Sequence, residues 1–268
     1  TVGWHHNLAS ILTSLGRVEE ARQVLGEVKL DHWGTQSWSP FWANLARAHH
    51  LTGRYQEELE VARRARELFP GDLLHVGSEL KALLGLGRLE EMTPILDGLQ
   101  ASTEGNPSNI FRQVSRELAF FGYHEESEAV AQRAVDWATT WSQNPNSLGM
   151  AISLLQAGRP AEAAPMLRRL VAEDPGNDAR MGWLGIALAQ TGDTEGAEEM
   201  VRDLEGLGSR YWLFQALILA HLDRKEEATR LLNQGLREGL HYAEIFNFNY
   251  FGPLWDYEPF RQVIAPKG

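Results

Sequence analysis

The stretch Leu15-Gly16-Arg17-Val18-Glu19-Glu20-Ala21 sets the organisation of this chain, because a recognisable version of it returns six more times. Each version has glycine, or one residue in its place, followed within a few positions by acidic residues. The turn residue lies at positions 16, 53, 87, 122, 158, 192 and 223. The differences between these positions are 37, 34, 35, 36, 34 and 31 residues, a period typical of stacked helical repeats.

Each copy predicts the turn of a helical hairpin. A glycine such as Gly16 adopts left-handed backbone at a helix end without a Cβ clash. The acidic residues that follow stabilise the start of the next helix through its dipole. Asp223 replaces glycine in the last copy, and aspartate tolerates this conformation better than most residues. Apolar residues recur at intervals of three and four, as at Leu8, Ile11 and Leu12, so both arms are expected to be amphipathic helices.

These units resemble the tetratricopeptide repeat, a helix–turn–helix motif of about 34 residues. The matching positions are Trp42 and Trp212 at the tryptophan, Leu184-Gly185 at the Leu-Gly pair, Ala21, Ala163, Ala197 and Ala228 at the first alanine, Ala65 and Ala134 at the second, and Pro70 and Pro175 at the closing proline. Glu58, Met92 and Ser127 depart from the first alanine, and we expect them to loosen their hairpins. Pro94 and Pro165 lie inside second helices, which should start late or kink.

The resemblance implies an all-α fold, an α-solenoid of about seven helix–turn–helix units in a right-handed superhelix with a C-terminal capping segment. We expect the repeat array over residues 1–239, with units one to seven starting near residues 2, 39, 73, 108, 144, 178 and 209. Their stacking should build one continuous core.

Residues 240–268 break the repeat and form an aromatic tail. Its aromatic residues are Tyr242, Phe246, Phe248, Tyr250, Phe251, Trp255, Tyr257 and Phe260. Because a repeat array needs the apolar face of its last unit covered, we expect the tail to cap unit seven and to enter the apolar half of the groove. The alternative is that the tail docks on another protein.

Composition excludes several classes of function. The chain has 25 Lys+Arg against 36 Asp+Glu and a net charge of −11, which opposes binding to nucleic acid or to an anionic membrane surface. It has no cysteine, which excludes disulfides, thiolate metal sites and a cysteine nucleophile. Its longest apolar runs are far shorter than the roughly 20 residues that span a bilayer. We expect a cytoplasmic location.

Catalytic motifs are missing from the sequence. It contains no Gly-x-Ser-x-Gly elbow, phosphate loop, dinucleotide fingerprint or His-Glu-x-x-His helix. The histidine pairs His5-His6 and His49-His50 point to different helix faces, so they do not predict a metal site. We therefore expect no enzyme, no cofactor and no metal.

The concave face of such a solenoid is lined by the first helix of every unit. Six positions before each turn residue, the sequence reads Ser10, Arg47, Lys81, Arg116, Ile152, Ile186 and Leu217. This column is basic in the first half and aliphatic in the second, and a basic ladder on an acidic protein favours an anionic partner. The alternative is that these cations pair with neighbours such as Glu79 and Glu117 and have no ligand.

Some family members hold a carboxy-terminal peptide with a clamp of Lys, Asn, Asn, Lys and Arg. Asn44 matches the middle asparagine, but the other places hold His6, Ser10, Leu74 and Ser78. The resemblance therefore does not imply a clamp for a chaperone tail.

We expect a non-enzymatic scaffold that binds an extended, acidic protein segment in its concave groove; the alternative is a domain that senses a small anionic molecule. The expected groove residues are Asn7, Asn44, Arg47, Lys81, Arg112, Gln113 and Arg116, and the expected apolar groove or cap contacts are Ile152, Trp183, Ile186, Phe214 and Leu217. The stretch over residues 253–261 resembles the end of bacterial tetratricopeptide signalling proteins, which often carry an upstream kinase, cyclase or winged-helix regulator. We expect an upstream effector domain of this kind.

Overall fold

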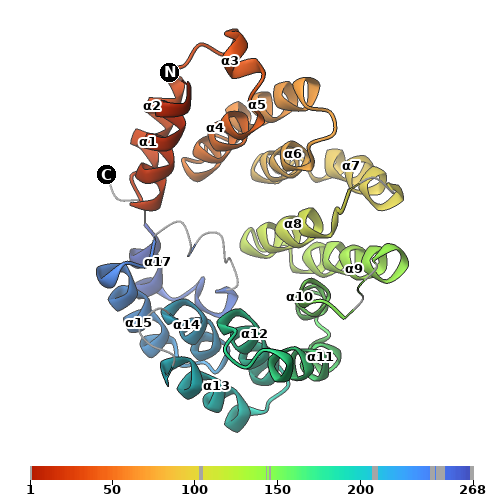
Figure 1. Ribbon diagram of the computed structural model, residues 1–268, viewed down its shortest axis with the longest axis vertical. Coiled ribbons are helices and arrows are strands. Elements are labelled where there is room, and N and C mark those ends of the chain that lie inside the picture. Colours follow the sequence, from red (N-terminus) through yellow and green to blue (C-terminus); the bar gives the residue numbers. More distant parts are fainter. Residues whose placement is uncertain are drawn as a thin grey trace.

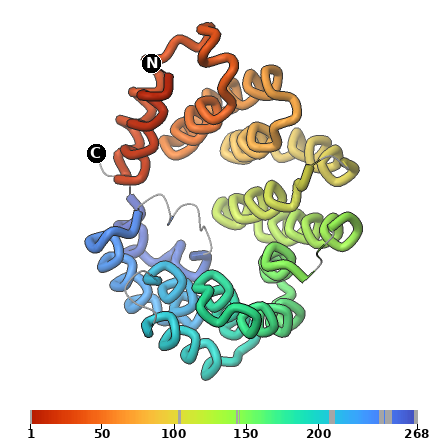
Figure 2. Tube along the Cα trace, in the orientation of Figure 1, coloured from red at the N-terminus to blue at the C-terminus, as the bar shows by residue number. Residues whose placement is uncertain are grey.

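The computed structural model describes residues 2–102, 105–142, 144, 146–206, 211–241, 245 and 251–265, and these residues form helices and connecting turns with no strand. Successive helical hairpins stack side by side into a solenoid (Figure 1). The chain sweeps round an arc, from the red N-terminal helices to the blue C-terminal ones (Figure 2). The predicted all-α solenoid is confirmed.

Seven helix pairs make up the described array. The first helices are α1 (Val2–Ser14), α4 (Ser39–Leu51), α6 (Leu73–Gly85), α8 (Ser108–Phe120), α10 (Leu148–Gln156), α12 (Asp178–Gln190) and α14 (Trp212–His221). The second helices are α2 (Val18–Gly26), α5 (Tyr55–Leu68), α7 (Leu89–Ala101), α9 (His124–Trp141), α11 (Pro160–Glu173), α13 (Thr194–Gly206) and α15 (Lys225–Glu238). Short α3 (Trp33–Gln36) lies between units one and two, and η1 (Gly252–Leu254) and α17 (Glu258–Ile264) belong to the tail.

The turn between the two helices of each unit has left-handed backbone, as predicted. The seven turn residues, Gly16, Gly53, Gly87, Gly122, Gly158, Gly192 and Asp223, have φ between 60° and 86°. Asp223 is the one non-glycine residue with positive φ in the described parts of the chain. All seven hairpins therefore have the same left-handed turn conformation.

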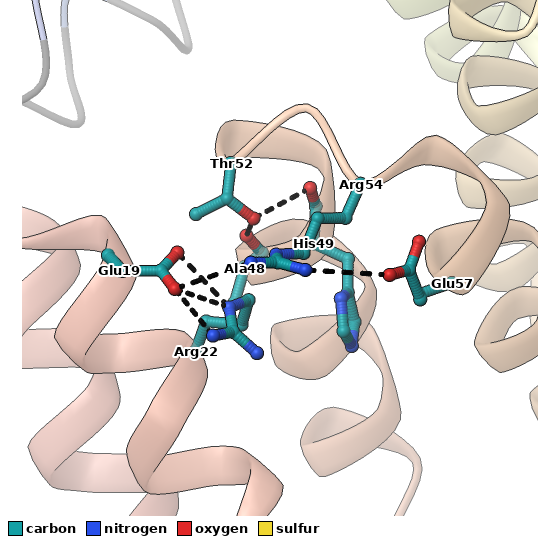
Figure 3. A network of polar contacts seen from close by, with 7 residues as sticks. All are labelled: Glu19, Arg22, Ala48, His49, Thr52, Arg54 and Glu57. Atoms are coloured by element: carbon teal, nitrogen blue, oxygen red, sulfur yellow. Dashed lines mark hydrogen bonds and ion pairs between the residues drawn. The ribbon is translucent and has the colours of Figure 1, made fainter.

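An arginine directly after most turns forms an ion pair with the glutamate three positions later. The pairs are Arg17–Glu20, Arg54–Glu57, Arg88–Glu91, Arg159–Glu162 and Arg224–Glu227. Arg54 also lies 3.7 Å from Glu19 of the preceding unit, which links units one and two (Figure 3). These side chains are largely exposed, so each pair contributes little to stability.

At five of the six junctions between units, a second helix packs on the first helix of the next unit, and at the junction of units three and four α6 packs on α8. The pairs α2 with α4, α5 with α6, α9 with α10, α11 with α12, and α13 with α14 are in contact. Two side chains show which face of the first helix is used: Nε2 of Gln215 donates to the carbonyl of Val201 at 3.1 Å, and Nη1 of Arg180 donates to that of Leu170 at 2.6 Å. Gln215 and Arg180 lie eight and twelve positions before their turns. We call these contacts the stacking interface.

Two glycines let neighbouring first helices approach closely. A Cβ on Gly185 would lie 2.4 Å from Cδ1 of Ile218, and one on Gly182 would lie 2.1 Å from Cδ1 of Phe214. Both contacts join α12 to α14. Gly185 belongs to the Leu-Gly pair of the repeat, so its role is to admit the next first helix.

The prolines inside second helices do not delay the helix start. α7 begins at Leu89 and includes Pro94, and α11 begins at Pro160 and includes Pro165. Both helices run on for at least seven residues beyond the proline. The expected late start is therefore wrong.

The apolar interior is divided into two clusters rather than forming one continuous core. One cluster holds residues of units one and two, such as Phe41 and Trp42, and the other runs from Leu59 through the later units to the tail. The interior also contains a buried carboxylate: Glu79 of α6 is 4% exposed and accepts from Arg63 of α5 at 2.9 Å and also from Arg66. A buried carboxylate is tolerated there because two guanidinium groups compensate for its lost hydration.

The three residues that replace the first alanine are buried. Oε2 of Glu58, which is 0% exposed, lies 2.9 Å from Nδ1 of His50 in the paired helix. Oγ of Ser127 donates to the carbonyl of Ser115 at 2.8 Å. Met92 is 3% exposed within the larger cluster. Side-chain hydrogen bonds or apolar packing thus occupy all three positions, and the loosening of these hairpins stays a prediction.

The described part of the tail packs on the last unit. α17 contacts α15, and η1 contacts α14. Phe251 and Phe260 are both 0% exposed, and their ring centroids lie 5.3 Å apart. The aromatic residues Tyr242, Phe246, Phe248 and Tyr250 lie outside the described residues.

His50 is held in its charged form. Its Nδ1 lies 2.9 Å from Glu58 and its Nε2 lies 3.6 Å from Oε1 of Glu117 on α8. Burial alone would lower the pKa of His50, but the two carboxylates outweigh it and raise the pKa to about 9. The imidazolium therefore joins α4, α5 and α8 at neutral pH.

Replacing Phe260 by alanine should destabilise the array. Loss of a fully buried phenylalanine lowers the free energy of unfolding by about 3–5 kcal/mol, which urea denaturation followed by circular dichroism would measure. Trp141→Ala is the matched control, because Trp141 is 52% exposed. Equal midpoints for both variants would show that the tail does not stabilise the last unit.

Raising the pH should weaken the array through His50. Because the folded pKa of about 9 exceeds the unfolded value of about 6.5, the stabilisation is complete below pH about 6.5 and is lost as the pH rises through about 9. The shift corresponds to about 3 kcal/mol. Urea denaturation at a series of pH values across this range should show a decline in the free energy of unfolding of the native protein that the His50→Gln variant lacks. If the free energy falls equally with pH in both proteins, the assigned role of His50 is wrong.

Candidate functional site

A cavity of about 370 Å³ lies between α4, α6 and α8. In Figure 1, α6 and α8 lie on the inner side of the arc and their partners α7 and α9 on the outer side. Three predicted groove residues, Arg47, Lys81 and Gln113, line this cavity, one from each first helix. We call it the basic cavity.

The wall of the basic cavity carries more positive than negative charge. Arg47, Lys81 and the protonated His50 face it together with one carboxylate, Glu117. Burial lowers the pKa of Arg47 from its usual value, yet a guanidinium stays protonated in proteins. Such a surplus of cations in a concave site attracts anionic groups.

Polar and apolar groups also line the basic cavity. Ser78 and Tyr55 supply hydroxyl groups. Leu74 is 52% exposed and Phe120 is 39% exposed, so two large apolar side chains are accessible at this site. Apolar walls with a few polar groups are typical of ligand sites. The cavity can therefore hold a carboxylate next to an apolar side chain.

Glu117 contributes to both the cavity and the fold. Burial would raise the pKa of Glu117, but the hydrogen bond and charge of His50, together with Lys81 and Arg116, lower it overall. Glu79, by contrast, pairs with Arg63 and Arg66 of α5. Of the two acidic neighbours named from the sequence, Glu117 therefore lines the basic cavity and Glu79 takes part in the contact between α5 and α6.

Other predicted groove residues are not part of the basic cavity. Asn44 uses its Nδ2 to contact Oγ of Ser10 at 3.0 Å and the carbonyl of His6 at 3.3 Å, which ties α4 to α1. Nη2 of Arg112 donates to Oδ1 of Asn109 at 3.4 Å, and Asn7 is exposed on α1. Their binding roles stay predictions.

Arg116 lines a separate pocket of about 150 Å³, together with Trp183 and Ile186. Trp255 of the tail lines the same pocket, and its ring centroid lies 4.8 Å from that of Phe120 on α8. The basic ladder is therefore divided: Arg47 and Lys81 face one cavity, and Arg116 faces another that the tail helps to form.

The predicted apolar groove residues are mostly covered. Exposed fractions are 3% for Trp183, 1% for Ile186, 6% for Phe214 and 0% for Leu217. Ile152 is half-buried. Trp183 and Phe214 pack with their ring centroids 6.2 Å apart. This half of the concave face belongs to the packed interior.

Most cavity residues were missed by reading one position per repeat, among them His50, Tyr55, Ser78, Leu74 and Phe120. Helical spacing could have found several of them. His50 lies three positions after Arg47, and Ser78 three before Lys81, so each pair shares a helix face. Tyr55 lies on α5, the second helix of its unit. A comparison of one first-helix position per repeat therefore does not reveal it.

The described residues offer neither a metal-binding cluster nor a membrane-spanning helix. They contain no group of three or more His, Asp or Glu side chains placed to hold a metal ion. None of the described helices has the length and apolar character required to cross a membrane.

Three solved structures resemble the chain at low similarity. A tetratricopeptide repeat protein from Parabacteroides merdae is 13% identical with a TM-score of 0.48, over 94% of this chain and 98% of that one. Human IFIT1 is 17% identical with a TM-score of 0.38, over 93% and 64%. Yeast Tom70 is 15% identical with a TM-score of 0.35, over 98% and 62%. The chain thus spans under two thirds of the last two, and similarity this low transfers no ligand or partner.

Sequence comparison addresses the family directly. No curated protein matches the chain. Two family models described as tetratricopeptide repeat match it, one over residues 39–72 and the other over residues 154–217. The first match covers unit two and the second runs from unit five into unit seven. With the recurring left-handed turn in all seven hairpins, these matches identify residues 39–72 and 154–217 as tetratricopeptide repeats.

Proposed function

We propose that this protein is a non-enzymatic scaffold that binds an extended, acidic protein segment in the basic cavity. One observation carries the proposal: Arg47, Lys81 and Gln113 come from three successive units and face one cavity beside exposed Leu74 and Phe120. A site built across three units suits an extended chain better than a compact one. The tetratricopeptide repeats support a role in protein interaction.

The charge distribution favours an acidic segment. A carboxylate between Arg47 and Lys81 would form charge-assisted hydrogen bonds, which contribute about 1.5–3 kcal/mol each. Gln113 would present an amide to the backbone or to a side chain of the segment. A neighbouring apolar residue of the segment would cover Leu74 and Phe120 and remove their surface from water.

A small anionic molecule is the second candidate. The cavity volume of about 370 Å³ falls within the range of about 300–1,000 Å³ found for small-molecule sites. Arg47 and Lys81 would serve either ligand. The two candidate ligands differ in how they use the apolar rim, which is the exposed side chains of Leu74 and Phe120, because only a peptide covers these side chains with apolar groups of its own.

Cytoplasmic location, bacterial origin and an upstream effector domain stay predictions of the sequence. These three properties would determine which acidic segments are available for the scaffold to bind. None of them alters the chemistry of the basic cavity.

Charge reversal at Lys81 should abolish binding of acidic peptides. A fluorescent peptide with the core Leu-Asp-Glu-Leu is a suitable probe, and Lys81→Glu should weaken it at least about tenfold, since an attraction of about 1.4 kcal/mol becomes a repulsion. Fluorescence anisotropy at low salt would measure the affinity. Arg230→Glu is the control, because Arg230 lies on α15 with its side chain 77% exposed. Equal loss of peptide affinity in both variants would show that the peptide responds to the overall charge of the protein and not to the basic cavity.

Replacing the apolar rim should separate the two candidate ligands. In the double variant Leu74→Ser with Phe120→Ser, peptide affinity should fall several-fold while affinity for citrate stays unchanged, because only the peptide buries apolar surface there. Isothermal titration calorimetry with both probes would measure this. If citrate binds tightly and the peptide does not bind to the native protein, the sensing role replaces the scaffold.

A further inference from the structure

Another cavity, of about 300 Å³, lies between the second helices of units three and four, α7 and α9. The two helices are joined toward the C-terminal end of α7, where Nη1 of Arg133 donates to Oδ1 of Asp97 at 2.6 Å and Nε1 of Trp137 donates to the carbonyl of Ser102 at 3.1 Å. The cavity lies toward their N-terminal ends. Figure 1 places α7 and α9 on the outer side of the arc, whereas the basic cavity lies between first helices. We call this space the outer cavity.

The packing between units three and four accounts for the outer cavity. At this junction α6 packs on α8, whereas at the other five junctions a second helix packs on the next first helix. The N-terminal half of α7 therefore leaves space beside α8 and α9.

The floor of the outer cavity is apolar. It is formed by Met92 and Leu96 of α7, Leu118 of α8 and Val130 of α9, which are 3%, 6%, 2% and 5% exposed. All four belong to the larger apolar cluster. A cavity of this size with an apolar floor suits the apolar part of a small ligand.

The rim of the outer cavity is acidic. Glu90 of α7 and Glu126 of α9 line it and are exposed. Among the described lining residues, Arg133 is the one cation, and its charge is balanced by Asp97. The rim therefore carries net negative charge, opposite to that of the basic cavity.

The charge of Glu126 is not compensated within its own hairpin. In five other units, the glutamate four positions after the turn forms an ion pair with the arginine directly after the turn; these glutamates are Glu20, Glu57, Glu91, Glu162 and Glu227. In unit four Tyr123 stands at the place of that arginine. The ion pair that occupies the other five glutamates therefore cannot form at Glu126.

Pro94 leaves a further acceptor at the same rim. Because proline has no N–H group, the carbonyl of Glu90, four residues earlier in α7, has no donor from that position of the helix. A backbone carbonyl in this state takes a hydrogen bond from water or from a ligand. Glu90 thus offers both its carboxylate and its carbonyl.

We propose that the outer cavity binds an aliphatic ammonium group, with its carbon chain on the apolar floor and its charged nitrogen at Glu90 and Glu126. An ammonium group has three donors and no acceptor. It can therefore donate to both carboxylates and to the carbonyl of Glu90. A small free amine and a lysine side chain of a partner protein share this chemistry.

Hexylammonium should bind in the outer cavity, and protein labelled with ¹³C in its methionine methyl groups would report it by nuclear magnetic resonance. Met92 is the one of the five methionines among the described lining residues, so its methyl resonance should shift while the other four stay unchanged. Butylammonium should bind about tenfold more weakly, because it buries two fewer methylene groups. Hexanoate, an anion with a similar chain, should not bind. An unshifted Met92 resonance, or equal binding of hexanoate, overturns the proposal.

Two variants with matched controls test the rim. Glu126→Gln should weaken hexylammonium binding at least about fivefold, because a charge-assisted hydrogen bond becomes a neutral one. Glu125→Gln is its control, since Glu125 is an exposed neighbour on α9 outside the lining residues. Ala129→Phe should abolish binding by filling the cavity from an exposed position, and Ala129→Ser should retain it.

Thermal melting followed by circular dichroism would establish that all four variants are folded. Equal hexylammonium affinity in Glu126→Gln and Glu125→Gln, or binding that survives in folded Ala129→Phe, overturns the proposal.

A blocked lysine, Nα-acetyl-lysine methylamide, distinguishes the two sources of the ammonium group. If it shifts the Met92 resonance as strongly as butylammonium does, the proposal is supported and the source is a lysine side chain. If only the free amines shift that resonance, the proposal is supported and the source is a small amine. If neither kind of probe shifts it, the outer cavity is not an ammonium site.

Discussion

The packing of one unit on the next is the contact on which the rest of the structure depends, through a second helix at five of the six junctions and through α6 and α8 at the other. A single hairpin cannot bury its apolar face alone, so an array of this kind is stable through contacts between neighbours. The left-handed turn at Gly16 and its counterparts brings the two helices of each unit together, and the stacking interface then joins one unit to the next. Eight positions before its turn, α4 contributes the buried Leu45 to this interface, whereas α6 contributes Glu79, which is buried in an ion pair with Arg63.

A second group of buried charged residues, around His50, connects the fold to the basic cavity. His50 joins α4, α5 and α8 through Glu58 and Glu117, and both His50 and Glu117 line the cavity wall. The proton on His50 therefore stabilises the junction and adds to the positive charge of the site. A change in its protonation affects both properties together, because a neutral imidazole leaves two carboxylates without their shared cation.

The sequence predicted the features that recur once per repeat. The turn at Asp223 and the placement of Arg47 and Lys81 on one face follow from a fixed offset in each unit, so local periodicity was sufficient. The separation of Arg116 from them could not be predicted, because it depends on Trp255, which belongs to a tail without a period. The pairing of Glu58 could not be predicted for another reason: its partner, His50, lies eight residues earlier in the paired helix, and residue type alone does not show that contact.

The contact between Phe120 and Trp255 limits the size of what the basic cavity can bind. Phe120 lines the cavity on one side and packs against the tail with ring centroids 4.8 Å apart, so the tail borders the open part of the groove at α8. That part spans three first helices, α4, α6 and α8. With about 8–10 Å between packed helices, the span is about 20 Å. An extended chain rises about 3.3 Å per residue, so about six residues fill it. Under the proposed function, the ligand would therefore be a short linear segment with its acidic residue between Arg47 and Lys81, and a longer partner would leave the groove before it reaches Trp255.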